Sequence, residues 1–490
     1  MSILPDARFY IDGEMRDASS GRTYQLTGPW TGKPVGRAAD AGEEDVDAAI
    51  AAARRAFDET DWSTNRTLRL ELVKKLRALF EENRDRLSDL ARHEAGSALG
   101  AVERAHVGNA LLGWDDLIRM FPEVTWEKDY GERDSGYGFS SKRIAYREPV
   151  GVVGAITPWN VPLYVNVGKV VAALLAGCTV VLKPAPNTPG MGAIFGELAA
   201  RAGFPPGVLN VVFGEDPALA GEMLVKDPRV DSISFTGSTA VGKRIMEMGA
   251  PTLKRLFLEL GGKSAKIVLD DSPNFAMDVM SSVLIFHAGQ GCAVQSRLLV
   301  PRSRYDEARE LLVKAYAGAS QRWGDFENPE HLMGPVVSQR QFDRVMGYIE
   351  LGKQEGATLL AGGNARPDLG DGYFIEPTCF VDVTPDMRIA QEEIFGPVLV
   401  VIPYEDDDDA VEIANNSDYG LSGGVSGGDL DRTLAIARRI RTGTVSVNGG
   451  MCIAGDLPFG GYKASGVGRE WGVEGIEEFL ETKLVAIRSS

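Results

Sequence analysis

The residue best suited to chemistry in this chain is Cys292, which follows a glycine-rich turn. It ends the segment Phe286-His-Ala-Gly-Gln-Gly-Cys292 and is one of only four cysteines in 490 residues. A thiol acts as a nucleophile in its thiolate form, and glycines just before it let a substrate oxygen approach backbone N–H groups. We therefore predict that Cys292 is a nucleophile, whose target this segment alone does not identify.

Three further polar residues stand in unusually apolar or glycine-rich segments. Asn160 occurs in Thr-Pro-Trp-Asn-Val-Pro, Glu259 in Leu-Glu-Leu-Gly-Gly-Lys, and Glu393 in Glu-Glu-Ile-Phe-Gly-Pro. A carboxylate between two leucines is expected to have a raised pKa, which suits a general base, and an asparagine amide can donate to a developing oxyanion. Singly, each could be a turn asparagine or a surface carboxylate, but their combination with Cys292 indicates an active site.

These distant residues need a framework, and the hydrophobic pattern predicts one. Short β-rich runs alternate with helical stretches from residue 151 onward, and a second alternating block follows residue 262. Such alternation predicts parallel sheets with helices on both faces. The expected strands are 150–156, 179–182, 209–212, 232–235 and 257–260, then 266–269, 298–300, 398–402 and 444–447. The expected helices are two or three within 45–105, then 163–176, 189–202, 240–248 and one just before Cys292.

Two segments fall outside this rhythm. Residues 133–147 alternate polar and apolar side chains, and residues 482–487 form another β-like stretch near the C-terminus. Detached strands carry unpaired backbone groups, so we expect these segments to pair with each other or with another subunit.

Two strand-to-helix turns are candidate ligand sites, because parallel sheets bind ligands at the carboxyl ends of their strands. Phe235-Thr-Gly-Ser-Thr-Ala-Val-Gly242 leaves backbone N–H groups free for a phosphate, although a tight turn capped by Ser238 or Thr239 explains the same residues. In Val181-Leu-Lys-Pro-Ala185, Lys183 stands at a strand end, where it can bind ribose hydroxyls or be merely solvated.

Composition narrows the class of protein. The length suggests roughly three domain-sized units, and 44% hydrophobic with 25% charged residues is ordinary for a soluble globular protein. The net charge of −17 disfavours nonspecific attraction to nucleic acid or membrane. The acidic run 405–409 is expected to begin a solvated helix.

Cysteine usage and the N-terminus point to a reduced, cytoplasmic protein. Residues 1–15 lack the apolar segment of a secretory signal. The cysteines are widely spaced, with no histidine at metal-ligand spacing, so no metal is expected. They are Cys178, Cys292, Cys379 and Cys452.

Seven segments, in this order and spacing, resemble the aldehyde dehydrogenase superfamily over nearly the whole chain. They are Thr157-Pro-Trp-Asn160, Lys183-Pro-Ala185, Phe235-Thr-Gly-Ser238, Leu258-Glu-Leu-Gly-Gly-Lys263, Gly289-Gln-Gly-Cys292, Glu393-Ile-Phe-Gly-Pro397 and Pro458-Phe-Gly-Gly-Tyr-Lys463.

The resemblance implies an α/β fold of three domains. A Rossmann-like, NAD(P)-binding domain would comprise 1–128 and 149–261, and an α/β catalytic domain 262–462. Strands from 129–148 and 475–490 would form a small β oligomerisation domain, so a homo-oligomer, either dimer or tetramer, is expected.

The resemblance also implies catalytic roles for an NAD(P)-dependent, non-acylating enzyme. Cys292 would add to an aldehyde carbonyl, giving a thiohemiacetal whose oxyanion is held by the Asn160 amide and the Cys292 backbone N–H. After hydride transfer to nicotinamide, Glu259 would activate the water that hydrolyses the thioester. Lys169 and Glu470 match positions implicated in proton relay.

The expected cofactor is NAD. Glu393 matches the position that binds the nicotinamide ribose and Phe395 its apolar support, while Lys183 matches an adenosine ribose contact and Ser238 a pyrophosphate contact. Pro186 stands where NAD-preferring members often carry a glutamate, so repulsion of a 2′-phosphate is weaker and NADP could be tolerated. The matching cofactor positions are Ile156, Thr157, Trp159, Lys183, Ala185, Pro186, Phe235, Gly237, Ser238, Gly261, Glu393 and Phe395.

The substrate is expected to be a bulky hydrophobic aldehyde, whether aromatic, terpenoid or medium-chain. Val161, Val165 and Gly168 fall where relatives acting on small aliphatic aldehydes often place larger residues, which predicts a wider tunnel. Alternatively, Tyr164, Phe286, Met451 or Ile453 refills the space. The expected pocket residues are Val161, Tyr164, Val165, Gly168, Phe286, Gly291, Ile453 and Phe459.

Some alternatives stay open at this point. His287 occupies a position commonly filled by asparagine, and it is either a packed histidine or a group that tunes the thiolate. A CoA-acylating semialdehyde dehydrogenase would use CoA in place of water, although Glu259 argues for hydrolysis. A non-catalytic, crystallin-like binding protein would keep the fold without turnover, which the retained Cys292, Asn160, Glu259 and Glu393 argue against.

Overall fold

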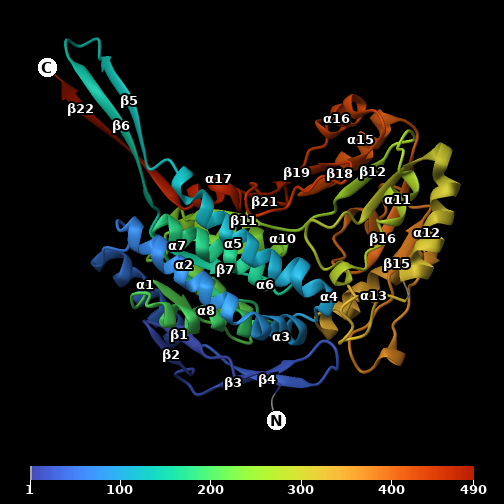
Figure 1. Ribbon diagram of the computed structural model, residues 1–490, viewed down its shortest axis with the longest axis horizontal. Helices are drawn as coiled ribbons and strands as arrows, with labels where there is room; N and C mark the ends of the chain where they lie inside the picture. The colour runs from blue at the N-terminus through green and yellow to red at the C-terminus, as the bar shows by residue number, and fades with distance from the viewer. Residues whose placement is uncertain (1–2, 320, 490) are drawn as a thin grey trace.

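The computed structural model describes residues 3–319 and 321–489. Figure 1 shows two lobes, each built around a sheet, and a β-stranded arm that projects from the body and carries the C-terminus at its end. We call the part built around the first sheet the first lobe and the part built around the second sheet the second lobe.

The first sheet has five parallel strands at its centre. They are β9 (Leu209–Val211), β8 (Thr179–Lys183), β7 (Val152–Ile156), β10 (Ser232–Thr236) and β11 (Arg255–Glu259), in that spatial order. All five coincide with predicted strands. The antiparallel β1 (Phe9–Ile11), β2 (Glu14–Arg16) and β21 (Gly466–Val467) complete the edges.

The strand order reverses direction between β7 and β10. The chain runs from β7 outward to β8 and β9, and then returns to the other side of β7 as β10 and β11. At such a switch point the turns that follow the two neighbouring strands diverge and leave a crevice at the carboxyl edge. The turn that carries Asn160 and the turn that carries Ser238 therefore lie on neighbouring strand ends.

The helices of the first lobe cover both faces of its sheet (Figure 1). The region predicted as helical within 45–105 forms α1 (Glu43–Glu59), α2 (Arg66–Glu82) and α3 (Arg84–Glu94), followed by α4 (Leu99–Ala101) and the π-helix η1 (Val102–His106). The others include α5 (Gly108–Met120), α8 (Pro189–Ala202), α9 (Pro217–Lys226) and α10 (Thr239–Gly249).

The helix predicted at 163–176 is not uniform. It consists of α6 (Pro162–Asn166), a π-helical turn η3 (Val167–Val171) and α7 (Ala172–Ala176). π-helical turns recur at functional sites because they change the direction in which side chains point. Lys169 lies in this turn.

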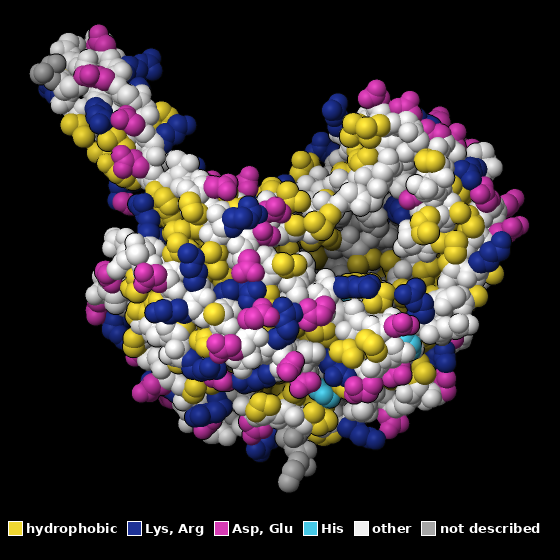
Figure 2. Space-filling model, in the orientation of Figure 1, with side chains coloured by type: hydrophobic (Ala, Val, Ile, Leu, Met, Phe, Trp, Pro, Cys, Tyr) yellow, Lys and Arg dark blue, Asp and Glu magenta, His cyan; other side chains and the backbone are white. Residues whose placement is uncertain are grey.

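The second sheet has the order β14-β15-β16-β13-β12-β18-β19, with β14 antiparallel to the rest. Its strands are β12 (Ala265–Val268), β13 (Arg297–Pro301), β14 (Thr358–Ala361), β15 (Thr378–Val381), β16 (Val398–Tyr404), β18 (Ser422–Ser426) and β19 (Thr444–Val447). Gly262 precedes β12 and Cys292 precedes β13, so both lie at the amino edge of this sheet. This edge faces the first lobe, and Figure 2 shows a hollow between the two lobes.

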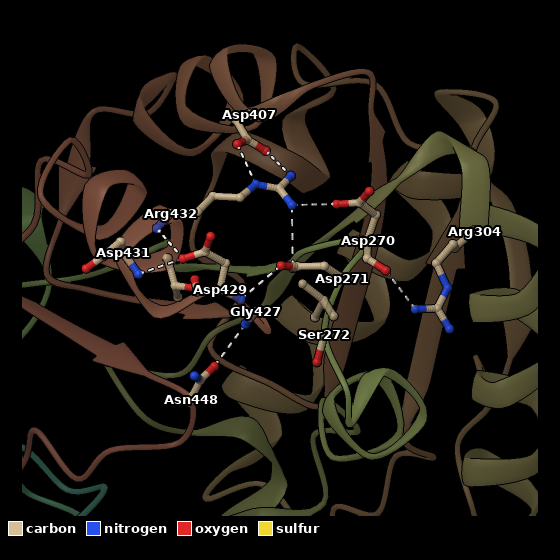
Figure 3. Close-up of polar contacts among 12 residues, drawn as sticks. Asp270, Asp271, Ser272, Arg304, Asp407, Gly427, Asp429, Asp431, Arg432 and Asn448 are labelled. Carbon is tan, nitrogen blue, oxygen red and sulfur yellow. Dashed lines mark hydrogen bonds and ion pairs between the residues drawn. The ribbon is translucent and has the colours of Figure 1, made fainter.

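The opposite, carboxyl edge of the second sheet is closed by an ion-pair network. Figure 3 shows the Arg432 guanidinium bound to Asp407 and Asp270, with Asp271 3.5 Å away. Asp407 begins α15 (Asp407–Asn415), whose N-cap is Asp406, which confirms the helix start predicted from the acidic run. The network ties α15 and α16 (Leu430–Ala437) to the segment after β12.

The arm is a three-stranded antiparallel sheet of β5 (Glu127–Asp134), β6 (Ser140–Pro149) and β22 (Leu480–Ser489), with β6 in the middle. The prediction of one strand at 133–147 is therefore wrong in extent, because this segment contains the end of β5, the hairpin turn and most of β6. The two detached segments do pair with each other, through β6 and β22. Within the described residues, no helix is long and apolar enough to cross a membrane.

Candidate active site

The segment 286–292, which we call the nucleophile turn, is irregular where a helix was predicted. The preceding helix α11 ends early (Phe275–Met280), and only a short 3₁₀ turn covers Phe286–Gly289. His287 and Ala288 have left-handed backbone angles, with φ of 46° and 51°. Such conformations cost non-glycine residues about 1–3 kcal/mol each and persist only where the surroundings impose them.

Hydrogen bonds to the second lobe impose this shape. The His287 N–H donates to the Leu332 carbonyl at 3.0 Å. The His287 carbonyl accepts from both the backbone N–H and the side-chain amide of Gln290, at 3.1 and 3.2 Å. The Gln290 side-chain oxygen in turn accepts from the Val337 N–H at 3.0 Å. Gln290 is therefore the central residue of the turn, a role that the sequence analysis missed.

Glycines let the nucleophile turn approach its neighbours closely. A Cβ at position 262 would lie 2.4 Å from the Cys292 carbonyl oxygen, and one at 289 would lie 2.3 Å from the Gly396 carbonyl oxygen. Gly289 also has a positive φ of 67°. The predicted pocket residue Gly291 is less constrained, since a Cβ there would meet the Val294 side chain at 2.8 Å.

Asn160 lies beside the nucleophile turn. Its side chain is buried, and its Nδ2 donates to the Gln290 carbonyl at 3.0 Å. A carboxamide nitrogen carries two hydrogens, so this bond fixes the side chain while the second N–H stays able to donate to a substrate oxygen. The fold thus brings Asn160 into contact with Gln290, which lies 130 positions later in the chain and two positions before Cys292.

The Cys292 thiol is half-buried, and its environment favours the neutral form. Burial is the main cause that raises the pKa of Cys292 to about 12, and the carboxylates of Glu259 and Glu393 raise it further. The N–H groups of Ala293 and of Cys292 itself act in the opposite direction. Glu259 ends β11 of the first sheet and Glu393 precedes β16 of the second, so the two carboxyl groups that act on Cys292 come from different lobes.

Glu259, at the end of β11, has the environment that its sequence predicted. The side chain is buried, and neither carboxylate oxygen has a hydrogen-bond partner among the described residues. Burial, followed by the charge of Glu470, raises the pKa of Glu259 well above its ordinary value, which Lys169 only partly offsets. A carboxyl group with a raised pKa can exchange protons near neutral pH.

Lys169 and Glu470 form a buried ion pair next to Glu259. The Lys169 Nζ lies 3.2 Å from Glu470 Oε1, and the two side chains are 0% and 6% exposed. The Lys169 Nζ also donates to the Ser234 hydroxyl at 3.2 Å. Ser234 was missed by the sequence analysis, because its strand alternates polar and apolar residues (Ser-Ile-Ser-Phe-Thr) and nothing distinguishes Ser234 from Ser232 or Thr236.

The predicted free space at Gly168 does not exist, because Trp471 occupies it. A Cβ at position 168 would lie 3.0 Å from both the Trp471 Cε2 and the Glu470 Cδ. Trp471 is fully buried, has a φ of 65°, and stacks on Tyr164 with the ring centres 4.4 Å apart. The glycine therefore makes room for an indole, and this part of the argument for a wider tunnel is wrong.

The other predicted pocket residues differ in burial. Phe459 exchanges two 2.7 Å backbone hydrogen bonds with Glu470, which places it beside the ion pair. Val165 is buried and Val161 is half-buried. Phe286 and Ile453 are exposed, at 40% and 36%, and so is Met451, at 79%. Of the residues proposed to refill the tunnel, only Tyr164 takes part in the stack on Trp471.

The residues predicted to bind the cofactor lie at the carboxyl ends of neighbouring strands of the first sheet. Lys183 ends β8 and is buried, and burial lowers its pKa to about 8; its Nζ lies 3.4 Å from the Pro184 carbonyl. The Pro186 carbonyl accepts a hydrogen bond from the Tyr24 hydroxyl at 3.1 Å. Ser238 is exposed and caps α10 by accepting from the Val241 N–H. The set is Ile156 at the end of β7 with Thr157 and Trp159 after it, Lys183 at the end of β8 with Ala185 and Pro186 after it, Phe235 in β10 with Gly237 and Ser238 after it, and Gly261 after β11.

Glu393 and Phe395 reach the same crevice from the second lobe. The Glu393 Oε1 accepts from the Gly262 N–H at 2.9 Å, and a Cβ at 261 would lie 2.5 Å from the Glu393 Oε2. The Phe395 ring meets Trp159 edge to face at 5.4 Å. The buried Lys183 ammonium with one weak contact, the half-buried Glu393 carboxylate and the small-residue turn at Ser238 suit a dinucleotide with ribose hydroxyls and a pyrophosphate.

Comparisons with known proteins agree with this site. The model of the aldehyde dehydrogenase family matches residues 15–485. A 3-succinoylsemialdehyde-pyridine dehydrogenase from a Pseudomonas species is 42% identical over 480 residues, covering 97% of this chain and 98% of that protein. An aldehyde dehydrogenase from Mycobacterium tuberculosis, solved with NAD+, is 41% identical with a TM-score of 0.93, covering 99% of this chain and 98% of that one. A mutant aldehyde dehydrogenase C from Pseudomonas syringae, solved with NAD+ and octanal, is 38% identical with a TM-score of 0.91, covering 98% and 96%. The chain belongs to the aldehyde dehydrogenase family.

Proposed function

We propose that this protein oxidises an aldehyde to the carboxylic acid with NAD, through a thioester on Cys292. The observation that carries the proposal is the hydrogen bond from the Asn160 amide to the Gln290 carbonyl, which joins the oxyanion donor to the nucleophile turn. The buried carboxyl group of Glu259 lies close enough to the Cys292 sulfur to raise the pKa of the thiol. These three groups together supply a nucleophile, an oxyanion donor and a base.

The residues act in sequence. Glu259 takes the proton of the Cys292 thiol and passes it to the Lys169–Glu470 pair, which returns Glu259 to its carboxylate form. The thiolate sulfur adds to the aldehyde carbon and forms a thiohemiacetal oxyanion, which accepts hydrogen bonds from the free Asn160 N–H and the Cys292 backbone N–H. NAD, when bound, supplies the hydride acceptor that turns this adduct into a thioester. Glu259 then takes a proton from the water that attacks the thioester, and the Lys169–Glu470 pair passes this proton toward solvent.

For the cofactor, we propose that Lys183 holds the adenosine ribose, Ser238 a pyrophosphate oxygen and Glu393 the nicotinamide ribose. Phe395 and Trp159, in edge-to-face contact, support the ring. Pro186 offers no carboxylate against a 2′-phosphate, so NADP is proposed as a slower alternative. The NAD+ complexes of the Mycobacterium and Pseudomonas syringae proteins support NAD as the main cofactor.

For the substrate, we propose a hydrophobic aldehyde, either medium-chain or aromatic. Val161, at the start of the helix that follows Asn160, and Val165, within it, have small side chains that leave room for a substrate. The packed rings of Tyr164 and Trp471 limit the size of that substrate. Octanal in the complex of the Pseudomonas syringae protein and the pyridine-bearing semialdehyde in the name of the Pseudomonas relative support this size class.

We also propose the three-domain assignment, with cofactor binding by 1–128 and 149–261, catalysis by 262–462, and assembly through 129–148 and 475–490. The arm exposes both edge strands and several large apolar side chains, including Tyr137 at 86% and Leu484 at 64% exposure. Exposed edges invite pairing with a second copy, and a cytoplasmic dimer or tetramer is the proposed form.

An initial-rate screen tests this function. Aliphatic aldehydes of increasing length and aromatic aldehydes are each supplied with NAD or with NADP, and the Cys292→Ala variant serves as the blank. We expect the highest kcat/KM for a medium-chain or aromatic aldehyde with NAD, and the acid as product. Acetaldehyde as the best substrate would overturn the substrate proposal. Strict dependence of turnover on added CoA would overturn the hydrolytic step.

A further inference from the structure

Two histidines meet beneath the nucleophile turn. The rings of His106 and His287 lie edge to face, with their centres 4.6 Å apart and an interplanar angle of 82°. His106 is 0% exposed and His287 is 4% exposed. Within the described part of the chain, none of their four ring nitrogens has a hydrogen-bond partner of good geometry, although the Asn160 backbone lies close enough to the His287 ring to act on its pKa. The contact between the rings is therefore one of packing, not of hydrogen bonding.

The two histidines belong to different lobes. His106 ends the π-helical turn η1, which continues from α4 in the first lobe. Figure 1 shows α4 at the boundary with the second lobe, where the Gly100 N–H donates to the His331 carbonyl at 3.1 Å. The His106 ring thus contacts the nucleophile turn from the first lobe, while the Leu332 carbonyl and the Val337 N–H bind the turn from the second lobe.

The contact lies at the strained part of the turn. His287 has a left-handed backbone, and its carbonyl accepts both Gln290 hydrogen bonds. The backbone carbonyl of Gln290 in turn accepts a hydrogen bond from the Asn160 side-chain amide. Any shift of His287 would therefore be passed through Gln290 to Asn160, and two residues further along the chain to Cys292.

We propose that His106 is a positioning residue for the nucleophile turn, and that its ring holds His287 in the shape that presents Cys292 and Asn160 together. The ring acts by its aromatic edge-to-face fit, which an aliphatic side chain of similar volume does not reproduce. Burial lowers the pKa of His287 to about 4 and that of His106 well below its ordinary value, so both rings are neutral at pH 7. The proposal rests on Cys292 being the nucleophile of the proposed function.

Two variants of His106 distinguish the effect of its aromatic ring from the effect of filling the space. His106→Phe keeps an aromatic ring and removes the nitrogens, while His106→Leu fills much of the space without a ring. His93→Leu is the matched control, because His93 also packs on an aromatic ring, Phe326, at 5.0 Å but makes no contact with the turn. The first readout is the rate at which iodoacetamide alkylates Cys292 in the enzyme without substrate, followed by peptide mass. The second is kcat and KM with NAD.

We expect His106→Leu to slow alkylation and kcat about tenfold or more while KM for NAD changes little, because a small misplacement of a reacting group costs rate more than binding. His106→Phe is expected to stay within about threefold of the parent protein, and His93→Leu to leave both rates unchanged. Leu and Phe variants that behave alike, whether both normal or both slow, would overturn the proposal. The alkylation rate can be measured without turnover, so it tests the role of His106 separately from the proposed function. Failure of the proposed function would be seen differently, as a Cys292→Ala variant that stays active.

Discussion

Trp471 packs against Gly168, and the two residues are matched in size. A Cβ on residue 168 would lie 3.0 Å from the Trp471 Cε2, tighter than ordinary van der Waals contact, and equally close to the Glu470 carboxyl group. The glycine thereby allows the indole, the ion pair and the Tyr164 ring to share one buried layer.

Gly168→Ala is therefore expected to destabilise the protein, although alanine ordinarily favours a helix. Overpacking costs about 1–3 kcal/mol, more than the roughly 0.5–1 kcal/mol gained in helix propensity. Denaturant unfolding measures the free energy. Gly347→Ala is the control, because a Cβ there meets nothing within 4 Å and the residue lies in a helix. Trp471→Leu empties a buried site and costs stability by itself, but in that background Gly168→Ala should cost less than in the parent protein. Equal gains at Gly168 and Gly347 in the parent protein would contradict the size matching.

Removing one partner of the Lys169–Glu470 pair should cost more than removing both. Lys169→Met leaves a buried carboxylate, which costs about 3–5 kcal/mol, while the double variant with Glu470→Gln leaves no charge in the site. Lys226→Met breaks an exposed pair with Glu222 and should cost less than ~1 kcal/mol. Unfolding free energies of the four proteins check this. A double variant as unstable as Lys169→Met would show that the pair is not coupled.

Alkylation of Cys292 should keep accelerating as the pH rises. Burial and two carboxylates raise the pKa of the thiol to about 12. Because the thiolate is the reacting form, the rate is expected to rise about tenfold for each pH unit between roughly pH 7 and pH 9. The measurement is the rate of iodoacetamide labelling of the peptide that contains Cys292, in enzyme without cofactor. A plateau below about pH 8 would contradict the burial argument.

His287 should make the protein lose stability in mild acid. Its folded pKa is lowered to about 4 from an ordinary value of 6.5, so the unfolded chain binds more protons between these two values. Stability contributed by the neutral ring is complete above pH 6.5 and falls as the pH drops toward 4, by about 1.4 kcal/mol for each unit. The difference in unfolding free energy between the parent protein and His287→Asn should therefore shrink with acidification. A difference that is independent of pH would show that folding leaves the pKa of His287 at its ordinary value, as in an exposed ring.

Sequence patterns predicted the regular parts of this protein well, because burial on both faces of a parallel sheet leaves continuous apolar runs. All five central strands of the first sheet followed this signal. The strand-end positions of Asn160, Lys183 and Glu259 followed from it, since a parallel sheet aligns its carboxyl ends. The raised pKa of Glu259 also follows from its two leucine neighbours and is confirmed by its burial.

The irregular parts could not be predicted, because they depend on contacts between distant residues. The left-handed backbone at His287 and Ala288 is imposed by Leu332 and Gln290, and nothing in the local sequence requires it. The space beside Gly168 is filled by a tryptophan 303 positions later (471 − 168), which spacing alone does not connect. The π-helical turn at Lys169 contains Gly168, but a single glycine does not distinguish a π-helical turn from an ordinary helix.

The central claim is that Cys292 carries the acyl group and that Glu259 is needed to release it. The most direct measurement is the mass of the Glu259→Gln variant after rapid mixing with NAD and a medium-chain aldehyde, followed by acid quenching and peptide mapping. The account predicts one acyl group per chain on the peptide that contains Cys292, a burst of NADH and little further turnover. Undiminished steady turnover by Glu259→Gln, or an acyl group on any other residue, would contradict it.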